Sequence, residues 1–207
     1  MFGQTIDTVE ELRDLLGAPT ELSLKKQLTE LDGHMRAFIA ASPFLVIGTF
    51  ARDGSCDVSP RGDPQGLVHV LDARHLVIPE RPGNRRADSL RNILETGRAA
   101  LLFLVPGRGD TLRVNGRACI TGEESLLAPC AVQGKRPSLG IGLEVEECFL
   151  QCAKALIRSR LWEAPVPQDS SPLPCLAEML MDQTQVAGHT VASLQALIDE
   201  AYATKLY

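Results

Sequence analysis

Two adjacent arginines, Arg85 and Arg86, follow Gly83-Asn84 at the start of a stretch whose apolar spacing predicts a helix. Cations in the first helical turn oppose the partial positive charge of the helix N-terminus, which normally prefers Asp or Glu. A bound phosphate would remove this conflict, because it could accept hydrogen bonds from free backbone N–H groups, both guanidinium groups and the Ser89 hydroxyl. The alternative is that both arginines point into water, at a cost of about a few tenths of a kcal/mol.

A second candidate arginine, Arg61, stands where a predicted strand ends in the turn Ser59-Pro60-Arg61-Gly62-Asp63. Such a turn can aim the Arg61 side chain inward, toward the same anion. The alternative is an exposed turn arginine that pairs with Asp63. Arginine favours fixed, bidentate recognition of phosphate or carboxylate groups, which a flexible lysine ammonium does not provide.

The charge of the chain is unevenly distributed along the sequence. The stretch from Arg52 to Arg117 holds eleven arginines, no lysine and eight acidic residues, so it carries +3 while the whole chain carries −5. The middle of the chain is therefore basic through guanidinium groups. The acidic total argues against non-specific binding of nucleic acid, and no nucleic-acid partner is predicted.

Other chemical motifs have little support in this sequence. The six cysteines form no CxxC pair and the four histidines are scattered, so no metal site is predicted and the cysteines are interpreted as structural. No GxSxG motif surrounds any serine. The acidic N-terminal residues lack the apolar core of a signal peptide, which together with the cysteines predicts a reduced, cytoplasmic location. The apolar stretch Ala99–Val105 is too short to span a bilayer, so no membrane association is expected.

The spacing of apolar residues predicts the elements that must position these side chains. Short β-type runs separated by turn residues are predicted at Phe44–Phe50, Cys56–Pro60, Gly66–Leu71, His75–Pro79, Arg98–Val105 and Thr111–Thr121. Helical spacing occurs at Thr8–Leu16, Ser23–Ala41, from Asn84 onward, at Glu146–Leu161 and near the C-terminus. Ala99–Val105 is apolar throughout, as expected of a strand covered on both faces.

Six predicted strands with tight turns and one internal helix indicate a mainly β fold with flanking helices, of the α+β class, built on an antiparallel barrel or sandwich. A single domain is predicted. Its parts are N-terminal helices at 1–41, a β core at 42–147 and C-terminal helices at 148–207, with a Pro/Ser/Asp-rich link at 164–174.

Three sequence segments occur in an order that points to a known family: SPFLVIGTFARDGSCDVSPRGD, LVIPERPGNRRADSLRNIL and AALLFLVPGRGDTLRVNGRACI. Together they resemble the pyridoxamine 5′-phosphate oxidase-like proteins, which bind flavin mononucleotide (FMN) on a split β-barrel. With the later CAKALIRSRLW, the resemblance covers roughly residues 42–162. It implies a homodimer with two flavins at the subunit interface.

The resemblance also implies roles for individual residues. Gly83, Asn84 and Arg85 match the phosphate-binding segment of the family, beside Arg86 and Ser89, and Arg61 matches a strand arginine that reaches the same phosphate. Ile78 and Pro79 match the strand end beside the isoalloxazine ring. Arg113 and Lys154 are expected to come from the partner subunit.

The function implied is that of an FMN-dependent oxidoreductase that transfers a hydride at the flavin N5 atom to or from a small-molecule substrate. The residues after Trp162 lack the C-terminal segment of the true vitamin B6 oxidases, so oxidation of pyridoxamine phosphate is not predicted. Two alternatives stay open. One is a flavin-binding or sensing module without turnover, and the other is a reductase that uses the deazaflavin F420.

Overall fold

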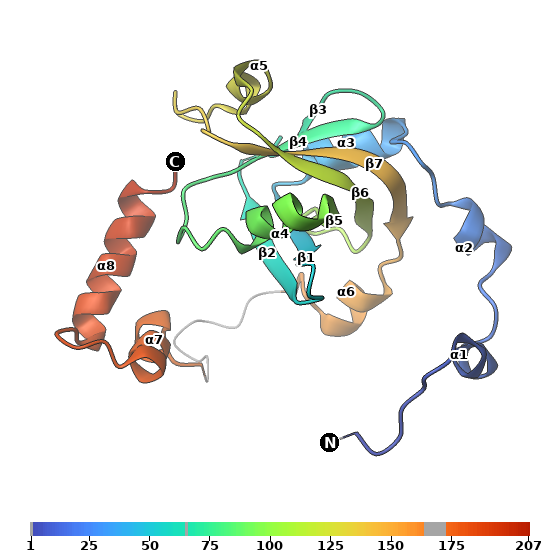
Figure 1. Cartoon of the computed structure of the whole chain (residues 1–207), viewed down its shortest axis with the longest axis horizontal. Coiled ribbons are helices and arrows are strands. Elements are labelled where there is room, and N and C mark those ends of the chain that lie inside the picture. Colours follow the sequence, from blue (N-terminus) through green and yellow to red (C-terminus); the bar gives the residue numbers. More distant parts are fainter. Residues whose placement is uncertain (1, 65, 164–172) are drawn as a thin grey trace.

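A seven-stranded antiparallel sheet with flanking helices forms the centre of the protein (Figure 1). The computed structural model describes residues 2–64, 66–163 and 173–207. The strand order in the sheet is β2-β1-β5-β6-β7-β4-β3. The strands are β1 Phe44–Phe50, β2 Cys56–Gly62, β3 His69–Val70, β4 His75–Pro79, β5 Arg98–Leu104, β6 Thr111–Thr121 and β7 Gly140–Gln151. The predicted mainly β fold with flanking helices is confirmed.

The helices lie around this sheet at its two sides and across one face (Figure 1). They are α1 Val9–Leu16, α2 Glu21–Lys25, α3 Gly33–Ala41, α4 Asp88–Thr96, α5 Glu124–Leu127, α6 Lys154–Ser159, α7 Leu176–Thr184 and α8 Val191–Thr204. Helix α4 packs mainly against β1 and β6. Helices α1 and α2 lie at one side of the sheet and α7 and α8 at the opposite side (Figure 1).

Alternation of side chains along the strands builds the core. Leu45 and Ile47 of β1 are fully buried, and so are Leu112 and Val114 of β6. In β5 the odd-numbered residues are buried, but Ala100 is exposed. The expectation that this strand is covered on both faces is therefore wrong. Its apolar composition reflects one buried face and one face that is only partly covered.

The helix predicted at Ser23–Ala41 is also wrong, because the chain is extended in its middle. Leu28 exchanges two backbone hydrogen bonds with Cys148 of β7, at N···O distances of 2.9 and 2.8 Å. Asp32 then begins α3 by accepting a hydrogen bond from the backbone N–H of Met35. The backbone N–H and C=O groups of Leu28 therefore form their hydrogen bonds with β7 and not within one long helix, which the helical spacing had predicted.

The helix predicted at Glu146–Leu161 is shorter in the structure, because β7 continues to Gln151 and α6 begins only at Lys154. Cys148 is consequently a buried strand residue while Cys152 is exposed. Most of the predicted link at 164–174 lies outside the described residues.

Burial of Cys148 makes the stability of the fold pH-dependent. Burial raises the pKa of the Cys148 thiol to about 11, because the charged thiolate loses its contact with water. The nearby negative charges of Asp32, Glu147 and Glu30 act in the same direction. The folded state therefore holds this proton more tightly than the unfolded chain. Its contribution to stability is complete below the ordinary pKa of 9.0 and is lost as the pH rises toward 11.

We expect the urea midpoint of unfolding to fall more steeply between about pH 9 and 11 in the wild type than in Cys148→Ala, because only the wild type loses this proton linkage. Replacement of the exposed Cys56 by Ala is the matched control and should leave the wild-type slope unchanged. Equal slopes for the wild type and Cys148→Ala would contradict the expectation.

Candidate functional site

A cavity of about 650 Å³ lies where the end of β2 meets the loop between β4 and α4. This volume is in the usual range for small-molecule sites, which is about 300–1,000 Å³. Its walls are formed by Ser59, Pro60, Arg61, Gly62, Leu67, Pro79, Glu80, Arg81, Pro82, Gly83, Asn84, Arg85, Ala87, Leu90, Leu206 and Tyr207. We call this space the loop cavity. Three arginines and one glutamate line it, so its charged residues favour an anionic ligand.

Curvature of the sheet brings the two halves of the loop cavity together. Strands β2 and β4 stand near opposite ends of the strand order. Nevertheless, Arg61 Nη2 lies 3.2 Å from Glu80 Oε2, and Arg81 Nε lies 2.8 Å from Asp63 Oδ2. Two ion pairs therefore connect strand ends that are far apart in hydrogen-bonding order. The sheet must roll until these ends meet, and the cavity is formed at that junction.

Arg61 is the most constrained cation of the loop cavity. Its side chain is 15% exposed, and its Nη1 donates to Ser59 Oγ at 2.6 Å and to the Pro60 carbonyl oxygen at 3.0 Å. Its Nε is buried and has no hydrogen-bond partner among the described residues, and neither does Glu80 Oε2, despite the 3.2 Å ion pair. An unpaired buried donor costs about 1–3 kcal/mol, so the ion pair with Glu80 leaves Arg61 incompletely satisfied on the wall of the loop cavity.

The loop that follows β4 has unusual backbone geometry. Arg85 and Ala87 have φ values of 63° and 57°, in the left-handed region that residues other than glycine seldom adopt. Asn84 supports this path, because its Oδ1 accepts a hydrogen bond of 3.0 Å from the backbone N–H of Arg86. Ala87 precedes α4 and provides no side-chain cap. The first N–H groups of α4 thus lack the side-chain acceptor that usually satisfies one of them.

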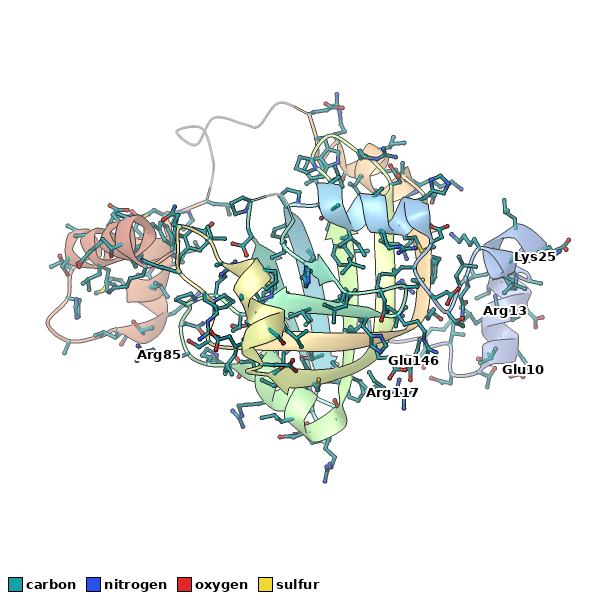
Figure 2. The ribbon with its side chains drawn as sticks, turned by 90° about the horizontal axis from the view of Figure 1, so that it is seen from above. Glu10, Arg13, Lys25, Arg85, Arg117 and Glu146 are labelled. Carbon is teal, nitrogen blue, oxygen red and sulfur yellow. The ribbon has the colours of Figure 1, made fainter. Side chains whose placement is uncertain are left out.

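Helix α4 begins at Asp88, so the two arginines precede the helix rather than occupy its first turn, as the spacing had predicted. Arg85 lines the loop cavity, and in the described part of the chain its guanidinium has no hydrogen bond or ion pair. In Figure 2 it lies on the side of the molecule where α8 is found. An exposed guanidinium held on a strained loop next to an anion-favouring cavity remains available for a ligand.

Arg86 and Ser89 do not line the loop cavity. Arg86 Nε lies 2.8 Å from Asp88 Oδ2, and this carboxylate raises the pKa of the arginine. Arg86 and Asp88 line a second cavity, of about 690 Å³, beside β2. Ser89 is buried and donates to Asp57 Oδ2 at 2.6 Å. The structure therefore separates these two residues from the cavity that Arg61 and Arg85 share. Their role in cofactor binding stays a prediction.

Of the remaining predicted site residues, some line the loop cavity and others lie elsewhere. Pro79, Gly83 and Asn84 line the loop cavity, but Ile78 is fully buried in the core. Arg113 is exposed on β6, with its guanidinium carbon 5.1 Å from the centre of the Phe149 ring. Lys154 is exposed at the start of α6. Neither of the last two residues lines the loop cavity of its own chain.

Sequence reasoning missed three residues around the loop cavity: Glu80, Arg81 and Tyr207. It gave Asp63 as a possible partner of Arg61, whereas Asp63 pairs with Arg81 in the structure. Arg81 donates from Nη2 to the Cys130 carbonyl oxygen at 2.7 Å, and it holds the loop against the segment before β7. The adjacent opposite charges of Glu80-Arg81, directly after a buried strand, were the available signal. No sequence pattern pointed to Tyr207, which lies 126 positions after Arg81.

Two further kinds of site were sought in residues 2–64, 66–163 and 173–207. No cluster of three or more His, Cys, Asp or Glu side chains in these ranges is arranged to hold a metal ion. No helix within them is long and apolar enough to cross a membrane.

Comparison with known proteins gives a family match over more than half of the chain. A family model described as "Pyridoxamine 5′-phosphate oxidase" matches residues 31–152. This range includes the β2 end and the loop after β4, but not Tyr207. No match was found among curated protein sequences.

Several solved structures are similar to this chain. A variant of HupZ from Group A Streptococcus is 18% identical, with 58% of this chain and 99% of that chain covered and a TM-score of 0.49. A candidate pyridoxamine 5′-phosphate oxidase from Lactobacillus delbrueckii is 23% identical, with coverage of 60% and 98% and a TM-score of 0.47. General stress protein 26 from Bacillus anthracis is 14% identical, with coverage of 56% and 88% and a TM-score of 0.43.

Proposed function

Because the chain belongs to the pyridoxamine 5′-phosphate oxidase family, we propose that it is an FMN-binding oxidoreductase whose phosphate site is the loop cavity. The observation that carries this proposal is the largely buried guanidinium of Arg61, which Ser59 and the Pro60 carbonyl oxygen hold on the wall of the loop cavity. Arg85 adds a second guanidinium, without a partner among the described residues, on the facing loop. A phosphate is an acceptor that both groups can bind with charge-assisted hydrogen bonds.

The residues around the loop cavity fit the rest of the cofactor as well. Backbone N–H groups at the uncapped start of α4 supply further donors for a phosphate. Pro60, Leu67, Pro79 and Leu90 provide apolar walls on which a ring system can rest. When bound, FMN supplies hydride transfer at its N5 atom, while the protein binds and orients it.

Glu80 places one restriction on this proposal. Its carboxylate lies 3.2 Å from Arg61 Nη2 and would repel a phosphate bound at the same guanidinium. We therefore expect a bound phosphate to compete with Glu80 for the Arg61 guanidinium. Replacement of Glu80 by Gln should then strengthen FMN binding, because it removes a negative charge without removing side-chain volume.

The proposal is tested by a titration of the purified protein with FMN, followed by absorbance and flavin fluorescence, and by anaerobic reduction of the complex with NADPH and NADH. A bound flavin spectrum that bleaches with either nucleotide is the expected result. A colourless protein that gives no spectral change with FMN would exclude the proposal. Mass spectrometry of any cofactor retained on purification distinguishes FMN from F420.

Replacement of Arg85 by Ala should weaken FMN binding by at least about tenfold, because one charge-assisted hydrogen bond contributes roughly 1.5–3 kcal/mol. The fold should be unaffected, since no described contact of the Arg85 guanidinium is lost. Arg160→Ala is the matched control, as Arg160 is exposed outside the loop cavity and pairs with Glu163. A change in affinity of less than about twofold would mean that Arg85 does not contact the phosphate.

The alternative function is a flavin-binding or sensing module without turnover. Tight FMN binding without reduction by nicotinamide nucleotides, and without oxidase activity on a panel of substrates, would favour the sensing module.

We further propose a homodimer, in which Arg113 and Lys154 serve the cavity of the partner subunit. Their exposure outside the loop cavity of their own chain supports this arrangement. Light scattering of the FMN complex would give its mass.

A further inference from the structure

Tyr207 forms part of the wall between two cavities, although it lies outside the family match at residues 31–152. It lines the loop cavity and also an adjoining space of about 430 Å³. Both spaces share Glu80, Arg81, Pro82 and Arg85 as well. Tyr207 therefore lies at the border of the two cavities.

Two contacts from separate elements hold Tyr207 in this position. Lys135 Nζ donates to the Tyr207 carbonyl oxygen at 3.0 Å, and the guanidinium carbon of Arg81 lies 5.4 Å from the centre of the Tyr207 ring. Arg81 is itself fixed by Asp63 and by the Cys130 carbonyl oxygen. The ring thus rests on an arginine that cannot follow it if it moves.

The segment that carries Tyr207 has few other attachments. Helix α8 has no buried residues and packs mainly against α7. The two helices lie at the side of the sheet opposite α1 and α2 (Figure 1). Segments with few buried apolar contacts open at low cost in free energy. Tyr207 is therefore held by contacts weak enough to break and reform without unfolding of the sheet.

We propose that Tyr207 is a gating residue of the loop cavity: its ring rests on Arg81, its backbone oxygen is held by Lys135, and the ring limits the entry and exit of the flavin. The inference rests on the proposed FMN site. Closure and opening of such a wall slow binding and release together, because the ligand passes only through the open form. The affinity is then much less affected than the two rates.

Stopped-flow measurement of FMN binding and release, with the flavin fluorescence as signal, tests this inference. In Tyr207→Ala both rate constants should rise at least about threefold, the factor expected from loss of a cation–π contact, and their ratio should change less. Iodide should also quench the fluorescence of bound FMN more strongly in the variant. Lys135→Ala removes the other contact and should shift both rates in the same direction.

Tyr202→Ala is the matched control, since Tyr202 lies on α8, is 60% exposed and lines neither cavity. Wild-type rates and quenching in Tyr207→Ala, with FMN still bound, would overturn the gating role. A loss of affinity with unchanged association would also overturn it, because Tyr207 would then be a contact of the bound flavin. If the wild type binds no FMN, the proposed function fails, and the gating role fails with it.

Discussion

Replacement of Arg61 by Ala is expected to weaken FMN binding by about 10- to 100-fold, because charged hydrogen bonds contribute roughly 1.5–3 kcal/mol each. The effect should exceed that of Arg85→Ala, since Arg61 is largely buried and is held in place by Ser59 and the Pro60 carbonyl oxygen. A cation that is already oriented loses little conformational freedom when it binds a ligand. Equilibrium titration with FMN gives the affinity of each variant.

Loss of Arg61 also affects the protein without its ligand. Glu80 would keep a partly buried carboxylate without its cation, which lowers the free energy of unfolding. Arg61→Ala/Glu80→Gln removes both charges and should recover stability but not FMN affinity. Recovery of affinity together with stability would show that Arg61 acts only through the fold. Arg61→Lys should bind with intermediate affinity, because an ammonium keeps the charge but not the planar set of donors of a guanidinium.

Replacement of Gly116 by Ala is expected to lower the free energy of unfolding by about 3 kcal/mol or more. A Cβ at this position would lie 1.9 Å from the backbone oxygen and 2.9 Å from the backbone carbon of Glu144. Backbone atoms cannot rotate away as a flexible side chain would. Gly116 stands at the irregularity where the register between β6 and β7 shifts. Urea denaturation measures the loss.

Gly116→Ala should also disturb the loop cavity, because β7 connects the two places. Strand β7 pairs with β6 at the irregularity and with β4 from His75 to Pro79, and Glu80 follows β4 directly. Near the irregularity, Arg117 Nε lies 3.2 Å from Glu146 Oε1, a pair labelled in Figure 2. Gly48→Ala in β1 is the matched control, since its Cβ would meet only the Ala100 carbonyl oxygen at 3.9 Å. Equal stability of the two variants would contradict the steric argument.

The sequence alone predicted part of the proposed site, and the reason is local. Gly83, Asn84 and Arg85 are neighbours in the chain, so a single segment delivers them to the same cavity. The same reasoning misplaced Arg86, because a loop with two left-handed residues turns consecutive side chains in different directions. Periodicity cannot anticipate such a path. Arg86 therefore pairs with Asp88 beside another cavity.

The strands and their buried faces follow from alternation, which depends only on neighbouring residues. Leu45, Ile47, Leu112 and Val114 are buried as that pattern requires. Helical spacing failed as a guide at Leu28, because its backbone forms hydrogen bonds with Cys148 of β7, far away in the sequence. The helix predicted across that position is consequently divided.

By itself, the sequence determined the family, the antiparallel β fold and the arginine-rich middle of the chain. Only the tertiary structure decided which charges meet. Curvature of the sheet brings Arg61 to Glu80 and Asp63 to Arg81, and it leaves Arg61 Nε without a partner among the described residues. Contacts with Arg81 and Lys135 place Tyr207 beside the loop after β4. These contacts join residues far apart in sequence, and they depend on how the strands roll and pair rather than on any local spacing.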